Sequence, residues 1–167
     1  MSRSLYSILF IVFFFKTCDQ IDSGKMPSVD APPKTQMLKG LSFVAPPRAF
    51  TNNPMEAVQA VNANWIAVIP YAYTRVGEAK VYFNTKRQWW GERIEGVEET
   101  IKIAKAANIN IVMKPQVYIA GSWTGDLDFD KDEDWAAWET DYTRYILTFT
   151  RLAAKHDIPI ICIGTEF

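Results

Sequence analysis

The stretch Trp65–Tyr71 (WIAVIPY) is apolar almost throughout, and Ile109–Val117 (INIVMKPQV) is a second run of the same kind. Continuous apolar runs of this length are typical of strands in a parallel sheet that helices cover. Shorter runs at Leu41–Ala45 and Ile160–Gly164 fit the same description. The sequence therefore predicts four parallel strands, with 41–45 first and 160–164 last.

Helical patterns separate these runs. Asn53 and Pro54 resemble a cap and a first helical residue, and apolar residues continue on one face to Val61. A second stripe runs from Ile94 to Ala107, and a third helix is expected from 132 to 156. The predicted order is βαβαβαβ.

Two architectures fit this order, an open doubly wound sheet and the first half of a (β/α)₈ TIM barrel. The turn after the first strand (PPRA, residues 46–49) has no glycine, so it offers no phosphate-binding loop. Long loops are expected over residues 72–91 and 118–131, and they favour the barrel, whose chemistry lies in such loops. We predict an α/β chain of about three and a half β/α units, a barrel truncated after strand four.

The first 37 residues indicate an export signal and a tether. An apolar run from Leu5 to Phe15 is too short to span a bilayer but suits a signal peptide over residues 1–17. Cys18 follows directly, as in bacterial lipoproteins; a plain signal peptide or an uncleaved anchor are alternatives. Residues 18–37 are expected to be a flexible linker, and 38–167 the folded domain, exported to the periplasm or cell surface.

Composition limits the possible partners and cofactors. The chain of 167 residues has a formal net charge of −1, which argues against binding nucleic acid. Any membrane association is expected only through the N-terminal signal or lipid anchor. Two cysteines and the single His156 make a disulfide framework, a zinc site or a histidine-based triad unexpected. No metal or organic cofactor is indicated.

The ends of the predicted strands carry the candidate polar side chains. In a barrel these ends meet at one mouth, which would bring together Tyr71, Lys114, Gln116 and Glu166. A partly buried Glu166 would hold its proton tightly, as a general acid near neutral pH requires. Lys114 would be a cation near it, or alternatively a lysine at a sheet edge.

Three tryptophans in the long loops are candidates for stacking on sugar rings. They are Trp89, Trp90 and Trp123. The alternative is that these indoles pack the loops onto the barrel. Trp135 and Trp138 lie on the third helical stripe and are expected in the core.

A set of short motifs, in order, resembles the family-113 glycoside hydrolases. They are Trp89-Trp90-Gly91, Met113-Lys114-Pro115-Gln116-Val117, Gly121-Ser122-Trp123 and Ile163-Gly164-Thr165-Glu166-Phe167. That family comprises β-mannanase-type enzymes of the large clan of (β/α)₈ retaining glycosidases. The resemblance covers most of residues 38–167.

The resemblance implies roles for particular residues. The acid/base glutamate of this clan closes strand four, which corresponds to Glu166, and Thr165 stands where many clan members have asparagine. Lys114, Gln116, Trp89, Trp90 and Trp123 would lie in the substrate cleft. The clan's nucleophile, a second glutamate, closes strand seven, so we expect it and the rest of the barrel to be missing from these residues. The two carboxylates of a retaining site lie about 5–5.5 Å apart.

Three functions stay open at this point. The first is half of an exported glycoside hydrolase acting on β-mannan or a related polysaccharide, inactive by itself. The second is a non-catalytic barrel fragment that binds glycans at the cell surface. The third is an unrelated barrel enzyme in which Lys114 forms a Schiff base.

Overall fold

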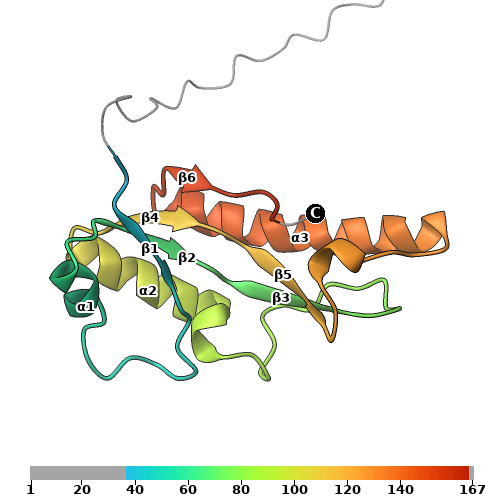
Figure 1. Cartoon of the computed structure of the whole chain (residues 1–167), viewed down its shortest axis with the longest axis horizontal. Helices are drawn as coiled ribbons and strands as arrows, with labels where there is room; N and C mark the ends of the chain where they lie inside the picture. Colours follow the sequence, from blue (N-terminus) through green and yellow to red (C-terminus); the bar gives the residue numbers. More distant parts are fainter. Residues whose placement is uncertain (1–36, 166–167) are drawn as a thin grey trace, which may run out of the picture. The chain divides into compact units, whose positions relative to one another are not determined.

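The computed structural model describes residues 37–165 (Figure 1). The predicted signal peptide, Cys18, all of the linker except Met37, and Glu166 lie outside the described residues. The elements of the described part are β1 (Gly40–Phe43), α1 (Met55–Ala60), β2 (Trp65–Val68), β3 (Tyr71–Arg75), the 3₁₀ turn η1 (Trp90–Glu92), α2 (Ile94–Ala106), β4 (Asn110–Met113), β5 (Gln116–Ala120), the 3₁₀ turn η2 (Thr124–Asp126), α3 (Asp132–Lys155) and β6 (Ile160–Ile161).

The main sheet has the strand order expected of a barrel. Its four strands are parallel and lie in the order β1-β2-β4-β6. Strands of this sheet that follow one another along the chain are therefore also neighbours in space. A doubly wound sheet would reverse its order at a switch point. The described residues show no such reversal, and the prediction of a partial (β/α)₈ barrel is confirmed.

The second and third predicted strands are each divided by a proline and continue beyond it. β2 is followed by β3 across Ile69-Pro70, and β4 by β5 across Lys114-Pro115. β3 and β5 pair with each other as a separate two-stranded parallel sheet, from Tyr71 opposite Gln116 to Arg75 opposite Ala120. Proline lacks the N–H that a ladder needs, which explains the interruption. The predicted starts of the loops at residues 72 and 118 are therefore wrong.

A buried tyrosine of α3 supports this interruption. The Tyr145 side chain is fully buried, and its hydroxyl lies within donating distance of the Pro70 carbonyl and, at 3.3 Å, of the Gln116 carbonyl. The Pro70 carbonyl also accepts the Gln116 N–H at 3.3 Å, so Tyr145 adds a buried donor beside a backbone hydrogen bond that joins the two strand breaks. α3 thus contacts both strand breaks through the hydroxyl of Tyr145.

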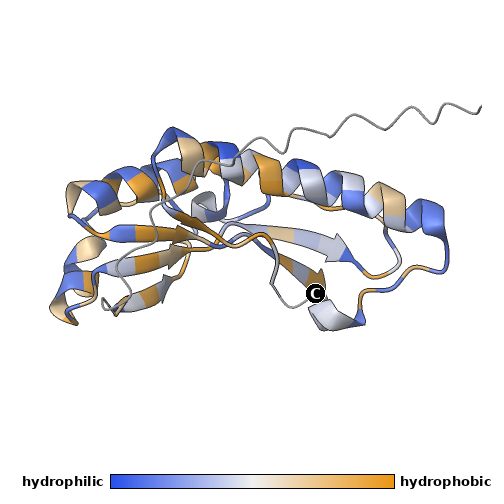
Figure 2. Ribbon diagram, turned by 90° about the horizontal axis from the view of Figure 1, so that it is seen from above, coloured by the Kyte–Doolittle hydropathy of each residue, from blue (hydrophilic) through white to orange (hydrophobic). Residues whose placement is uncertain are grey.

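The core lies between the strands and helices α2 and α3. Figure 2 shows these helices along one side of the strands. Alternate residues of β2 and β4 are buried with apolar residues of the helices; the set includes Ile66, Val68, Ile111, Met113, Val97, Ile101, Phe149 and Leu152. Trp138 also belongs to this core, as its helical stripe predicts, whereas Trp135 is half-buried against it.

The shorter elements also follow from their sequences. The Asn53 side-chain oxygen accepts the N–H of Met55 at 3.1 Å, which is the capping role expected of it. Asn108 ends α2 with a positive φ of 56°. Val61 lies beyond α1 and is 61% exposed, so its predicted place on the apolar face is wrong. No helix within residues 37–165 is both long enough and apolar enough to cross a bilayer.

Candidate active site

A cavity of about 320 Å³ lies where β1, β2 and β4 end. We call it the strand-end cavity. It is lined by residues from three strand ends and from the loop before α2, namely Ser42, Phe43, Val44, Ala45, Ile69, Tyr71, Trp89, Glu92, Lys114 and Gln116. The carboxyl ends of the strands are where barrel enzymes place their chemistry.

The strand breaks place Tyr71, Lys114 and Gln116 in this cavity. The Lys114 N–H donates to the Val68 carbonyl at 2.8 Å, and the Gln116 N–H donates to the Pro70 carbonyl at 3.3 Å. Residues two apart in extended chain point to the same face, so Lys114 and Gln116 both face the cavity. The ammonium group of Lys114 has no hydrogen-bond or ion-pair partner within residues 37–165, which leaves it available to a ligand or another carboxylate.

Trp89 forms part of the cavity wall, and its indole is 50% exposed. The preceding residue attaches this loop to β3. The side-chain amide of Gln88 donates to the Tyr71 carbonyl at 2.7 Å, and its oxygen accepts the N–H of Thr85 at 2.9 Å. The indole is therefore presented by an anchored loop.

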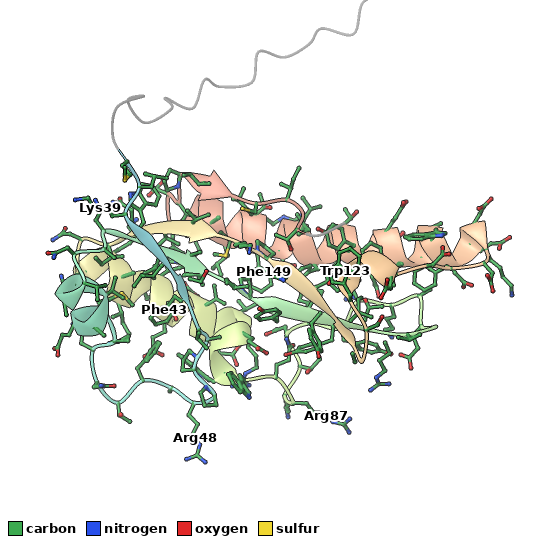
Figure 3. The ribbon with its side chains drawn as sticks, in the orientation of Figure 1. Lys39, Phe43, Arg48, Arg87, Trp123 and Phe149 are labelled. Carbon is green, nitrogen blue, oxygen red and sulfur yellow. The ribbon has the colours of Figure 1, made fainter. Side chains whose placement is uncertain are left out.

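The other two loop tryptophans lie elsewhere. Trp90 is half-buried, packs edge-to-face on Phe50 with ring centroids 5.9 Å apart, and donates its N–H to the Pro47 carbonyl. Trp123 is 63% exposed at the start of η2 (Figure 3). Neither lines the strand-end cavity, and their contact with a sugar stays a prediction.

Glu92 is a cavity residue that the sequence analysis missed. It is only 6% exposed, and one carboxyl oxygen accepts the Tyr73 hydroxyl at 3.0 Å. Burial raises the pKa of Glu92 above its ordinary value, while the hydrogen bond from Tyr73 acts in the opposite direction. Burial, together with the negative charge of Glu92, also raises the pKa of the Tyr73 hydroxyl. In the sequence, Glu92 resembles an acidic residue that precedes a helix, and nothing local marks its burial.

The last described residues continue from the sheet toward this end of the domain. β6 pairs with β4 through Met113 and Ile161, and the Cys162 N–H donates to the Met113 carbonyl at 2.9 Å. The Tyr142 hydroxyl then donates to the Ile163 carbonyl at 2.8 Å. The Thr165 hydroxyl is buried without a hydrogen-bond partner among the described residues. Glu166, the residue that follows, lies outside them.

Two solved structures described as GH113 mannanases have a similar fold. One is described as a complex of a GH113 β-1,4-mannanase; it matches with a TM-score of 0.64 and 20% identity over 77% of this chain. Another is the GH113 β-mannanase AaManA of Alicyclobacillus acidocaldarius in complex with ManMIm, with a TM-score of 0.66 and 18% identity over 78% of this chain. The matched region is 45% of each of those chains, so this chain spans under half of their length.

The sequence comparisons give the family. A search of curated proteins finds no significant match. The model of Glycoside Hydrolase Family 113 matches residues 47–167, which is most of the chain and includes every strand end that lines the cavity except that of β1. The chain belongs to glycoside hydrolase family 113.

Proposed function

We propose that this chain supplies one side of the active site of a retaining glycoside hydrolase that acts on β-mannan or a related polysaccharide. The observation that carries the proposal is the strand-end cavity, which joins an exposed indole, an amide and an unpaired ammonium group in a family-113 chain. Sugars are bound by this combination because the indole stacks on the ring while the polar groups bind hydroxyls. The solved family members described as mannanases support the choice of substrate.

In the proposed mechanism, Glu166 is the general acid/base. It protonates the leaving oxygen as the glycosidic bond breaks, and later removes a proton from the water that attacks the glycosyl-enzyme intermediate. Lys114 and Gln116 bind substrate hydroxyls, and Trp89 stacks against a sugar unit. The nucleophilic carboxylate comes from the part of the barrel beyond these residues, since Glu98 and Glu99 lie within α2 and the carboxyl group of Glu92 is buried against the Tyr73 hydroxyl.

A non-catalytic role in glycan binding is the second candidate, because two indoles, those of Trp89 and Trp123, are at least half exposed. Stacking on aromatic side chains requires no catalytic carboxylate. This alternative predicts binding of mannan oligosaccharides without turnover, even when the remaining part of the barrel is supplied.

Release of reducing sugar from β-1,4-mannan tests the proposal. The chain should be inactive alone and active when joined to the complementary half of a family-113 barrel. Glu166→Gln should then lower turnover by at least about 100-fold, the range of one general acid. Lys39→Ala, an exposed residue just before β1 and outside the cavity lining, is the control and should leave turnover unchanged. Robust Glu166-dependent hydrolysis by the chain alone would contradict the proposed division of the site, and binding without turnover by the joined protein would favour the second candidate.

A further inference from the structure

A second cavity of about 670 Å³ lies beside the strand-end cavity. Trp89 lines both. The other wall residues come from β3, which contributes Tyr73 and Arg75, from the loop that follows it, which includes Tyr82 and Arg87, and from the last residue of β5, Ala120. We call this the basic cavity, and a ligand chain that leaves the strand-end cavity past Trp89 would enter it.

The basic cavity carries an excess of positive charge. Arg75, Lys86 and Arg87 line it, and no Asp or Glu does. Arg75 is paired with Glu78 at 3.2 Å, just outside the lining. Lys86 and Arg87 have no side-chain partner within residues 37–165, and Figure 3 shows Arg87 projecting from its loop. Because the whole chain has a net charge of −1, this excess is a local feature.

The wall of the basic cavity is already held in place. Tyr82 pairs with Tyr73 through two backbone hydrogen bonds of 2.8 Å, which tie the loop to β3. The Tyr82 hydroxyl donates to Glu78 at 2.9 Å, and Arg75 and Lys80 lie over its ring at 5.3 and 5.2 Å. A wall that is ordered before binding loses less conformational entropy when a ligand enters. The Lys86 and Arg87 side chains, which have no such contacts within residues 37–165, do not share this ordering.

We propose that the basic cavity binds an anionic group, a carboxylate or a phosphate, carried by a sugar adjacent to the unit in the strand-end cavity. This inference rests on the proposed function, because it extends the same glycan chain past Trp89. A guanidinium fork and an ammonium group are the side chains that recognise these anions. Lys86 and Arg87 would supply the two ion pairs, and Trp89 the stacking surface between the two units. The preferred substrate would thus be a mannan that carries acidic groups, with neutral mannan bound more weakly.

Calorimetric titration of the 167-residue chain tests this inference with three probes. They are a neutral mannotetraose, the same tetramer with a glucuronate side group, and the same tetramer with a phosphate group. The acidic tetramers should bind about tenfold more tightly than the neutral one, the size expected of two exposed ion pairs. The advantage should shrink as salt is raised from 50 to about 500 mM. The acidic tetramer with the larger gain in affinity over mannotetraose shows whether the cavity prefers a carboxylate or a phosphate.

Two double variants with the same loss of charge complete the test. Lys86→Ala with Arg87→Ala should abolish the advantage of the acidic tetramers and leave the affinity for mannotetraose within about twofold. Lys39→Ala with Arg151→Ala removes one exposed lysine and one exposed arginine outside the cavity, and should preserve the advantage. Equal affinity for all three tetramers, or an equal loss of the acidic tetramers' advantage in both double variants, overturns the proposed anion site but not the proposed glycan binding. Absence of binding by every tetramer overturns the glycan function, and this inference with it.

Discussion

Removal of the Tyr73 hydroxyl tests the chemical state of the buried carboxyl group of Glu92. In Tyr73→Phe the phenol that donates to Glu92 at 3.0 Å is lost, while the ring and its packing remain. Glu92 is 6% exposed, so water does not readily replace the donor. A hydrogen bond between neutral groups is worth about 1 kcal/mol, and one to a charged group about 1.5–3 kcal/mol.

The cost of Tyr73→Phe should therefore depend on pH. Burial raises the pKa of Glu92 above its ordinary value of 4.5, so the folded protein binds this proton more tightly than the unfolded chain. Stability associated with Glu92 is then greatest at low pH and falls as the pH rises from 4.5 to the folded pKa. Loss of the Tyr73 donor raises the pKa of Glu92 further, so the free energy of unfolding falls over a wider pH range. We expect the variant to lose about 1 kcal/mol at pH 4 and about 1.5–3 kcal/mol at pH 8.

Urea unfolding followed by tryptophan fluorescence measures this difference at both pH values. Tyr118→Phe is the matched control, because Tyr118 lies against Tyr73 with ring centroids 5.9 Å apart but is half exposed. It should change the free energy of unfolding by less than about 0.5 kcal/mol. In a Glu92→Gln background, Tyr73→Phe should cost the same at pH 4 and pH 8. A pH-independent cost in the original background would refute the reasoning.

Three further variants test other parts of the structure. Thr74→Val removes the buried acceptor that Trp138 uses at 2.9 Å, and should lower the free energy of unfolding by about 1–3 kcal/mol in urea titrations. Glu98→Gln should destabilise the protein at neutral pH but not in acid. Hydrogen bonds from Lys155 and His156 lower the pKa of Glu98 to about 2, so the stability that Glu98 contributes is present above pH 4.5 and is lost as the pH falls toward 2. Melting temperatures measured across this pH range test the expectation. Lys114→Ala should weaken mannotetraose binding about tenfold in calorimetry, whereas Lys39→Ala should leave it unchanged.

The elements that the sequence predicts well are those with a repeating apolar pattern. β2, β4, α2 and α3 lie within one or two residues of their expected places or inside the expected runs. The sequence does not predict β3, because the polar residues of this strand break the apolar pattern. Thr74 is nonetheless fully buried: its hydroxyl donates to the Lys80 carbonyl and accepts the Trp138 indole N–H. Contacts between residues 64 positions apart leave no local periodicity to detect.

The residues of the candidate site also differ in how well the sequence predicts them. Lys114 and Gln116 were found because a strand end in a parallel sheet fixes where its side chains lie. The loop residues have no such rule: of the adjacent Trp89 and Trp90, one lines the cavity and the other packs on Phe50. Their placement depends on Gly91, where an added Cβ would lie 2.2 Å from the ring of Pro46. That close approach positions the turn that buries Glu92, so the placement of this acidic cavity residue depends on a contact between two loops far apart in the sequence.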